Sequence, residues 1–260
     1  MKNSDRLEVN DARAIVRLLG EVCANPGDHV AKKRQLMDGI CEMIAADRWG
    51  WGLAAQMEPG KPSVHISLLH GGFTEKTYAA YTQAYSHPEM TAVHELFAAE
   101  IAEKRCHLTR LRQQMDPEEG FKKTGAYAYW QAADIDGVIM SLRPLDSTTF
   151  SILGIYRRCG ADLFTPRENR IAHILLSEVP SLHTQGWPDD RGITLPNLST
   201  RKRMTLGLLV QGYKREQIAD HLRLSLHTVN DYVQAVFKHF AVRSQAELMV
   251  RFQSGDGGDK

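Results

Sequence analysis

The sequence predicts an α+β chain: an N-terminal α/β sandwich with about five antiparallel strands, followed by a C-terminal all-α domain of four helices. At 260 residues the chain is about twice as long as a typical domain, so we expect two domains. Helical and strand-like apolar patterns alternate over residues 1–183, whereas residues 198–253 carry helical patterns alone. Residues 184–197 are rich in Gly, Pro and Asp and are predicted to be a linker, and 254–260 a disordered tail.

The elements of the N-terminal domain follow from the spacing of its apolar residues. We predict helices at 11–24, 30–46, 74–84, 91–104 and 116–133, and strands at 49–57, 64–69, 106–112, 138–145 and 149–158. The first two strands should form a hairpin, and all five should join one sheet. A closing helix is expected to begin at Thr165, where a cap, a first-turn proline and the capping-box residue Glu168 follow one another. Pro180 should limit this helix.

The stretch 217–240 carries two helical patterns separated by a turn. Ser225 is the predicted N-cap of the second helix, because its hydroxyl can accept a hydrogen bond from the amide of about Thr228. Apolar residues then recur at helical spacing at Val229, Tyr232, Val233, Val236, Phe237 and Phe240. The opposite side presents His227, Asn230, Asp231, Gln234 and Lys238. Hydrogen-bonding side chains of this kind can contact base edges and phosphates.

Positive charge is concentrated in the C-terminal region. The net charge of the whole chain is +1, but residues 197–253 hold nine Lys or Arg against four Asp or Glu, a net +5. Residues 1–196 carry a net −3. This distribution favours contact between the C-terminal helices and nucleic acid. The sequence has no run of about 18 apolar residues and its start lacks the order of a signal peptide, so we expect a cytoplasmic protein.

Residues 198–252 resemble the LuxR-type helix-turn-helix of bacterial transcription factors. The residues that match the family pattern in register are Leu198, Ser199, Arg201, Gly212, Ile218, Ala219, Leu222, Ser225, Thr228, Val229, Val242, Arg243, Ser244 and Glu247. The resemblance implies a transcriptional regulator that binds double-stranded DNA. The expected DNA-contacting residues are Arg201, Ser225, His227, Thr228, Asn230, Asp231, Gln234, Lys238 and Arg243. One such helix binds weakly, so we expect a homodimer on paired half-sites.

Three positions depart from the family pattern. Lys202 replaces the usual early glutamate, Arg223 stands where the turn commonly has glycine, and Asn230 replaces a frequent lysine. We expect the first change to remove an internal ion pair, the second to strain the turn, and the third to remove a phosphate or guanine contact. An alternative function is an interaction protein that does not bind DNA and titrates another regulator through these helices.

The N-terminal domain resembles GAF- or PAS-type sensory domains, mainly over residues 152–177, where its closing helix begins at a Phe-Thr-Pro-Arg-Glu turn. It is also similar to acyl-homoserine-lactone receptors, whose Tyr-rich helix is echoed by Tyr81, Tyr85 and Pro88. His87 stands where that family has an aspartate that accepts the ligand's amide hydrogen, and a histidine is a poorer acceptor. The resemblances imply a domain that receives a small molecule or a partner, with a homoserine lactone not the first choice.

Seven aromatic residues are candidates to line a ligand cavity: Trp49, Trp51, Tyr78, Tyr81, Tyr127, Tyr129 and Trp130. Packing in a hydrophobic core is the competing explanation for each of them. The domain also holds His65, His70, His87, His94 and His107. Their spacing is not that of metal ligands, and the four cysteines form no C-x-x-C pair, so we expect no metal and no other cofactor. No catalytic motif is found in the sequence, and we expect no enzymatic activity.

Overall fold

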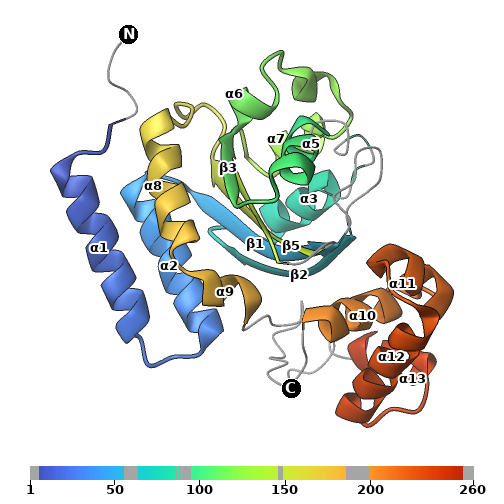
Figure 1. Ribbon diagram of the computed structural model, residues 1–260. Helices are drawn as coiled ribbons and strands as arrows, with labels where there is room; N and C mark the ends of the chain where they lie inside the picture. Colours follow the sequence, from blue (N-terminus) through green and yellow to red (C-terminus); the bar gives the residue numbers. More distant parts are fainter. Residues whose placement is uncertain are drawn as a thin grey trace.

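The computed structural model describes residues 6–55, 64–85, 87, 89, 95–145, 149–185 and 200–253. These residues form an N-terminal domain, in which helices lie on both faces of a sheet, and a bundle of C-terminal helices (Figure 1). The α+β class predicted from the sequence is confirmed. No helix in the described part of the chain is both long and apolar enough to cross a membrane.

A five-stranded antiparallel sheet forms the middle layer of the N-terminal domain. Its strands are β1 (Arg48–Ala55), β2 (Val64–Gly71), β3 (Leu108–Leu111), β4 (Gly137–Pro144) and β5 (Thr149–Arg157). They lie in the order β2-β1-β5-β4-β3, and every neighbouring pair is antiparallel. The predicted hairpin of the first two strands and the single five-stranded sheet are therefore confirmed.

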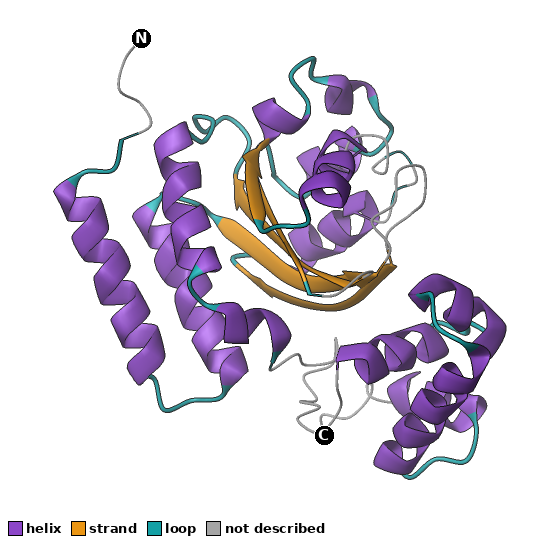
Figure 2. Cartoon of the chain, in the orientation of Figure 1, coloured by secondary structure: helices purple, strands orange, loops and turns teal. Residues whose placement is uncertain are grey.

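Helices cover both faces of this sheet (Figure 2). On one face lie α1 (Val9–Ala24), α2 (His29–Met43), α8 (Pro166–Ser177) and α9 (Pro180–Thr184). On the other lie α3 (Glu75–Tyr85), α5 (Glu95–Lys104), α6 (Arg112–Met115), the 3-10 helix η1 (Gly120–Lys123) and α7 (Tyr127–Ala132). Helix α1 is outermost and packs on α2 and α8, where Arg167 Nε donates to the buried carboxylate of Asp11 at 2.8 Å.

Alternate residues of each strand face different helical layers, because side chains along a strand point to opposite sides. In β1, Trp49 and Trp51 pack in the core beneath α2 and α8. An added Cβ on Gly50, between them, would lie 2.9 Å from the hydroxyl of Tyr81 in α3. The two layers therefore have separate interiors, and each strand contributes to both.

One local prediction is wrong. The helix expected at 116–133 is broken into η1 and α7, because Glu119 adopts a left-handed conformation with φ 51° and Thr124 an extended one. The prediction that Pro180 limits the closing helix agrees with the structure, because α8 ends at Ser177. Pro180 itself occupies the first turn of α9, a position that tolerates proline because its missing N–H has no helical acceptor. His183 in α9 is completely buried.

The C-terminal helices are α10 (Thr200–Val210), α11 (Arg215–Leu222), α12 (Leu226–Phe240) and α13 (Gln245–Gln253), which confirms the predicted all-α unit. Helix α10 is central to this bundle and contacts α11, α12 and α13. It also contacts β2 of the sheet. Five residues of α10 are buried in these contacts: Met204, Thr205, Leu206, Leu208 and Leu209.

Candidate functional site

The turn between α11 and α12 joins two helices through two well-defined caps. Arg223 ends α11 in the left-handed conformation, with φ 51° and ψ 48°. Ser225 caps α12, and its Oγ accepts a hydrogen bond from the backbone N–H of Thr228 at 3.1 Å. The predicted N-cap is thus confirmed. Between the caps, Leu224 N–H donates to Ala219 O at 2.9 Å, which holds the turn against α11.

The two sides of α12 have the distribution predicted from the sequence. Its inner side is fully or almost fully buried at Val229, Val233, Val236 and Phe240. Its outer side is exposed at His227, Asp231, Gln234 and Lys238. The side chain of His227 is 89% exposed, and its Nε2 lies 3.7 Å from a carboxylate oxygen of Asp231, which is 66% exposed. A helix buried on one side therefore presents a continuous polar side to solvent.

Asn230 is half-buried in this polar side and is held by a residue of the preceding helix. Its Oδ1 accepts a hydrogen bond from Arg215 Nη1 at 3.0 Å. This contact leaves the two amide hydrogens of Asn230 as donors. Arg215 was not predicted as a site residue, because it lies fifteen positions earlier in the sequence and only the packing of α11 on α12 brings the two together.

Seven of the nine predicted DNA-contacting residues lie on α12 or its cap, and the other two come from elsewhere. Arg201 of α10 is half-buried and donates to Leu222 O at 3.0 Å, so it satisfies a carbonyl at the end of α11. Arg243 is exposed just before α13, where its backbone N–H donates to Glu247 Oε2 at 2.8 Å. Arg201 is therefore held at the turn rather than on the exposed side of α12.

The sheet separates the seven aromatic candidates into two groups. Trp49 and Trp51 face α2 and α9. Trp49 Nε1 donates to Asp38 at 2.8 Å, and Trp51 Nε1 donates to Ser151 Oγ at 2.8 Å. Both indoles are buried and hydrogen-bonded within the core. They do not share one cavity with the aromatic residues on the other face.

The second group lies on the α3 and α7 side of the sheet. Tyr81 and Trp130 are buried there, with Tyr78 and Tyr127 packed against the same cluster. The hydroxyls of Tyr81 and Tyr156 are 3.1 Å apart, and burial raises the pKa of Tyr81. Tyr129 is 39% exposed and lies beside His87, with ring centroids 6.0 Å apart.

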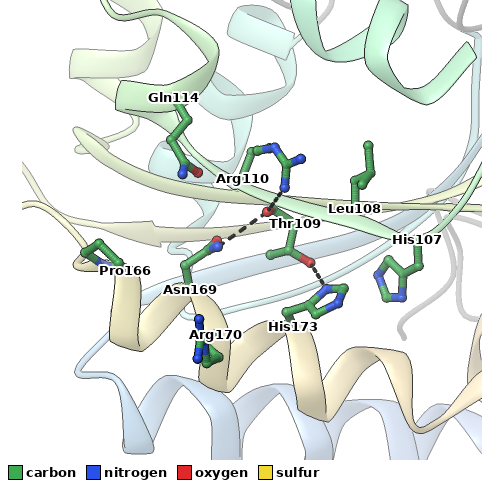
Figure 3. A pocket seen from close by; sticks show the side chains of 9 residues that line it. All are labelled: His107, Leu108, Thr109, Arg110, Gln114, Pro166, Asn169, Arg170 and His173. Carbon is green, nitrogen blue, oxygen red and sulfur yellow. Dashed lines mark hydrogen bonds between the residues drawn. The ribbon is translucent and has the colours of Figure 1, made fainter. Parts of the chain in front are cut away.

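A polar network on the α8 side of the sheet was not predicted. Thr109 Oγ1 of β3 lies 2.9 Å from His173 Nδ1 (Figure 3). It also lies 2.9 Å from Ser141 Oγ, which in turn lies 2.8 Å from His107 Nε2. Desolvation by burial lowers the pKa of His107 to about 3 and also lowers the pKa of His173. Both imidazoles are therefore neutral near pH 7. The residues come from three elements far apart in sequence, so no local pattern indicated the network.

A third neutral histidine lies beside this network. His183 Nδ1 is 2.9 Å from Ser151 Oγ, and its ring centroid is 5.3 Å from that of His107. Desolvation by burial lowers the pKa of His183 to about 4. No group of three or more His, Cys, Asp or Glu residues within the described ranges is arranged to hold a metal ion.

Comparison with known proteins identifies the C-terminal helices. Residues 196–252 match the family of bacterial regulatory proteins described as the luxR family. The C-terminal region is therefore a LuxR-family domain. None of the curated proteins matches the chain.

The solved structures to which the chain is similar include the following three. One is SdiA in complex with octanoyl-rac-glycerol, 13% identical over 97% of each chain, with a TM-score of 0.43. Another is a crystal structure of Escherichia coli SdiA, 13% identical over 92% of this chain and 94% of that chain, with a TM-score of 0.45. The third is the LBD domain of VqsR from Pseudomonas aeruginosa, 14% identical over 68% of this chain and 94% of that chain, with a TM-score of 0.46. At these values the solved structures do not assign the N-terminal domain to a class.

Proposed function

We propose that this protein is a dimeric DNA-binding transcriptional regulator whose N-terminal domain senses a small molecule or a partner. The observation that carries the proposal is the arrangement of α12, which has one polar, exposed side and an opposite side that is buried in the core. The LuxR-family match over residues 196–252 supports it.

In this proposal α12 is the recognition helix and enters the major groove. Asn230, Asp231 and Gln234 face base edges, where amide and carboxylate groups discriminate between bases. Lys238 contacts phosphate, which gives affinity without sequence information. Because Arg215 engages Asn230 Oδ1, the amide of Asn230 acts mainly as a donor and favours base acceptors such as guanine O6 and N7. A second subunit on a paired half-site supplies the affinity that one helix lacks.

The sensing part of the proposal concerns how the N-terminal domain influences α12. The aromatic group of Tyr78, Tyr81, Tyr127 and Trp130 is the proposed ligand-contacting surface, in keeping with the GAF- and PAS-type resemblance of the sequence. Helix α10 contacts both β2 and α12, so it is a direct mechanical link between the sheet and the recognition helix. A ligand acts through this link only if it binds one arrangement of the two domains more tightly than another.

The decisive experiment compares base-reading with phosphate-contacting positions. A genome-wide binding profile of the full-length protein first defines the preferred operator, and fluorescence anisotropy then measures affinity for that operator and for a random duplex. Asn230→Ala and Gln234→Ala should each weaken operator binding by about 1–3 kcal/mol with little effect on the random duplex. Lys238→Ala should weaken binding to both and reduce the salt slope by about one.

Lys76→Ala is the matched control, since Lys76 is an exposed lysine on α3, far from α12 in the sequence. It should change neither affinity. Equal losses for operator and random duplex in the Asn230 and Gln234 variants would contradict the assignment of the α12 surface. No salt-dependent binding to any duplex would favour the alternative of a protein that titrates another regulator.

A further inference from the structure

Helix α1 has two apolar sides, and the core of the domain covers only one of them. Ile15, Leu18 and Val22 are buried where α1 packs on α2 and α8. On the outer side Val9 is 68% exposed and Val16 is 70% exposed, the highest values for large apolar side chains among the described residues. Because α1 is the outermost helix on its face of the sheet (Figure 1), this second apolar side is turned toward solvent.

The outer side has the residue spacing of a two-stranded coiled coil. All but one of its residues are exposed, with Leu19 half-buried, and they recur at alternating steps of three and four: Val9, Ala12, Val16, Leu19 and Cys23. Such steps place the side chains in one narrow stripe, at the a and d positions of a heptad. Valine at a with leucine at d favours a pair of parallel helices. The pattern therefore indicates a second helix of the same kind as the covering element.

The charges beside the stripe are complementary only in a parallel pair. In that arrangement a g residue of one helix lies beside the e residue five positions later in the other, and on α1 these are Glu8, the N-cap, and Arg13. Two-fold symmetry forms this ion pair twice. An antiparallel pair brings each flank against the same flank of the second helix. Glu8 would then meet Ile15 or Val22, and the flank of Arg13 has no acidic residue.

The size of the surface determines how strong such a contact is. Helix α1 has 16 residues. A helix of that length is about 24 Å long and about 12 Å wide, so one side buries on the order of 300 Å² per subunit. A stable dimer buries about 800 Å² per subunit. The contact is therefore weak in the free protein and is strengthened when paired half-sites on DNA hold two subunits together.

We propose that the outer side of α1 is a dimerisation surface that pairs in parallel with α1 of a second copy of this chain. The a and d residues of the two helices meet along the stripe, so Cys23 of one copy lies at the same level as Cys23 of the other. Glu8 of each copy lies beside Arg13 of the other. This inference rests on the proposed dimeric function and identifies the contact between the N-terminal domains.

Thiol cross-linking of the full-length protein tests both the surface and the direction of the helices. In the Cys106→Ser, Cys159→Ser variant the exposed thiol is Cys23. Cys41 is half-buried, and burial raises the pKa of its thiol to about 12, so it reacts poorly. A short bismaleimide should convert this variant to covalent dimer, and operator duplex should increase the yield. The matched control is the Cys23→Ser, Cys159→Ser variant, which keeps the exposed Cys106 and should give at least about fivefold less dimer.

A charge in the middle of the stripe should break the contact. Val16→Glu keeps α1 helical, because glutamate has a higher helix propensity than valine. In the Cys23 variant it should lower the cross-linking yield by about fivefold or more, and analytical ultracentrifugation should show the same loss of dimer. Leu163→Glu is the matched control, since Leu163 is an exposed apolar residue outside α1, and it should change neither measurement.

A charge exchange separates the ion pair from a loss of structure. Arg13→Glu places two acidic residues side by side and should lower the fraction of dimer several-fold. Adding Glu8→Lys to the same chain restores opposite charges and should recover most of that loss. A merely structural effect of Arg13→Glu would not be reversed by the second change.

The results also distinguish this inference from the proposed function. Cross-linking through Cys23 no greater than through Cys106, with and without operator, or a dimer unaffected by Val16→Glu, would overturn the α1 pairing. Operator binding as a dimer in that case would leave the proposed function intact and place the contact elsewhere, for example at the exposed Val250 of α13. Cross-linking through Cys23 in a protein that binds no duplex would support the pairing and contradict the proposed function alone.

Discussion

Two residues in the C-terminal domain end helices in a conformation that side chains rarely adopt. Arg223 ends α11 with φ 51°, and Ala241 ends α12 with φ 52°. For a non-glycine residue, the Cβ is then too close to a carbonyl oxygen, which costs about 1 kcal/mol. The sequence resemblance anticipated this strain at Arg223, because glycine is common at that position of the turn.

Replacing Arg223 with glycine should therefore stabilise the protein. We expect Arg223→Gly to raise the free energy of unfolding of the C-terminal helices by about 1 kcal/mol, measured by urea denaturation, because glycine relieves the left-handed strain. DNA affinity and its salt dependence should not change. Ala241→Gly is the matched control, because Ala241 has the same left-handed conformation but no charge. It should stabilise the protein by a similar amount.

A phosphate contact by Arg223 would give a different result. Arg223→Gly would then weaken binding to every duplex and make the salt slope shallower by about one, whereas Ala241→Gly would not. A destabilised Arg223→Gly variant with unchanged DNA binding would contradict both explanations.

At the scale of elements, the packing of α3 on the sheet depends on two glycines in neighbouring strands. Gly50 of β1 is paired with Gly154 of β5. The hydroxyls of Tyr81 and Tyr156 occupy the space above them: an added Cβ on Gly50 would lie 2.9 Å from Tyr81 Oη, and one on Gly154 would overlap Tyr156 Oη. The absence of side chains at this pair lets the two buried tyrosines reach each other and the sheet.

Gly154→Ala should destabilise the N-terminal domain by about 1–3 kcal/mol, because the added methyl group overfills a packed core. Urea denaturation of the full-length protein measures the change. Tyr156→Ala removes the overlapping hydroxyl and ring atoms, so the Gly154→Ala, Tyr156→Ala double variant should lose less stability than the sum of the single variants.

Gly20 provides the matched control, because an added Cβ there meets nothing within 4 Å. Since Gly20 lies within α1, Gly20→Ala should stabilise by up to about 1 kcal/mol through helix propensity. Full stability of Gly154→Ala, or additive losses in the double variant, would show that the Tyr156 side chain does not limit this position.

At the scale of the whole molecule, three neutral histidines lie where the sheet packs against α8 and α9, the helices that precede the C-terminal domain in the sequence. His107 lies next to β3, His173 in α8 and His183 in α9. Burial lowers the pKa of each, to about 3 for His107 and about 4 for His183. The unfolded chain, with histidine pKa values of about 6.5, binds more protons than the folded protein in mildly acidic solution.

The free energy of unfolding should therefore be highest above pH 6.5 and should fall as the pH decreases from about 6.5 toward 4. Each of these histidines contributes a slope of up to about 1.4 kcal/mol per pH unit. Urea denaturation of the wild type and of His173→Gln should be measured from about pH 7 to about pH 5. The free energy of unfolding should change less per pH unit in the variant than in the wild type.

A stability that is constant or rises on acidification in this window would contradict the assignment of neutral, buried imidazoles. Equal slopes for wild type and His173→Gln would exclude His173 as one of the groups responsible.

The sequence alone determined the features of this protein that depend on neighbours within about three helical turns. The Ser225 cap, the two sides of α12, and the Thr165 and Glu168 capping box involve residues three to eleven positions apart. The five strands and the hairpin were likewise predicted from local patterns. Such patterns are readable because helical and strand geometry fix which nearby side chains share a side.

Only the tertiary structure decided which distant residues meet. It placed Trp51 and Tyr81 on opposite faces of the sheet, brought Arg215 to Asn230, and brought Thr109 of β3 to His173 of α8, 64 positions away. A hydrogen bond or a cavity between such residues depends on strand order and on helix placement, and these are set by burial over the whole domain. The spacing of residues along the chain does not predict strand order or helix placement. Apolar periodicity shows which side of an element is buried, but not which other element covers that side.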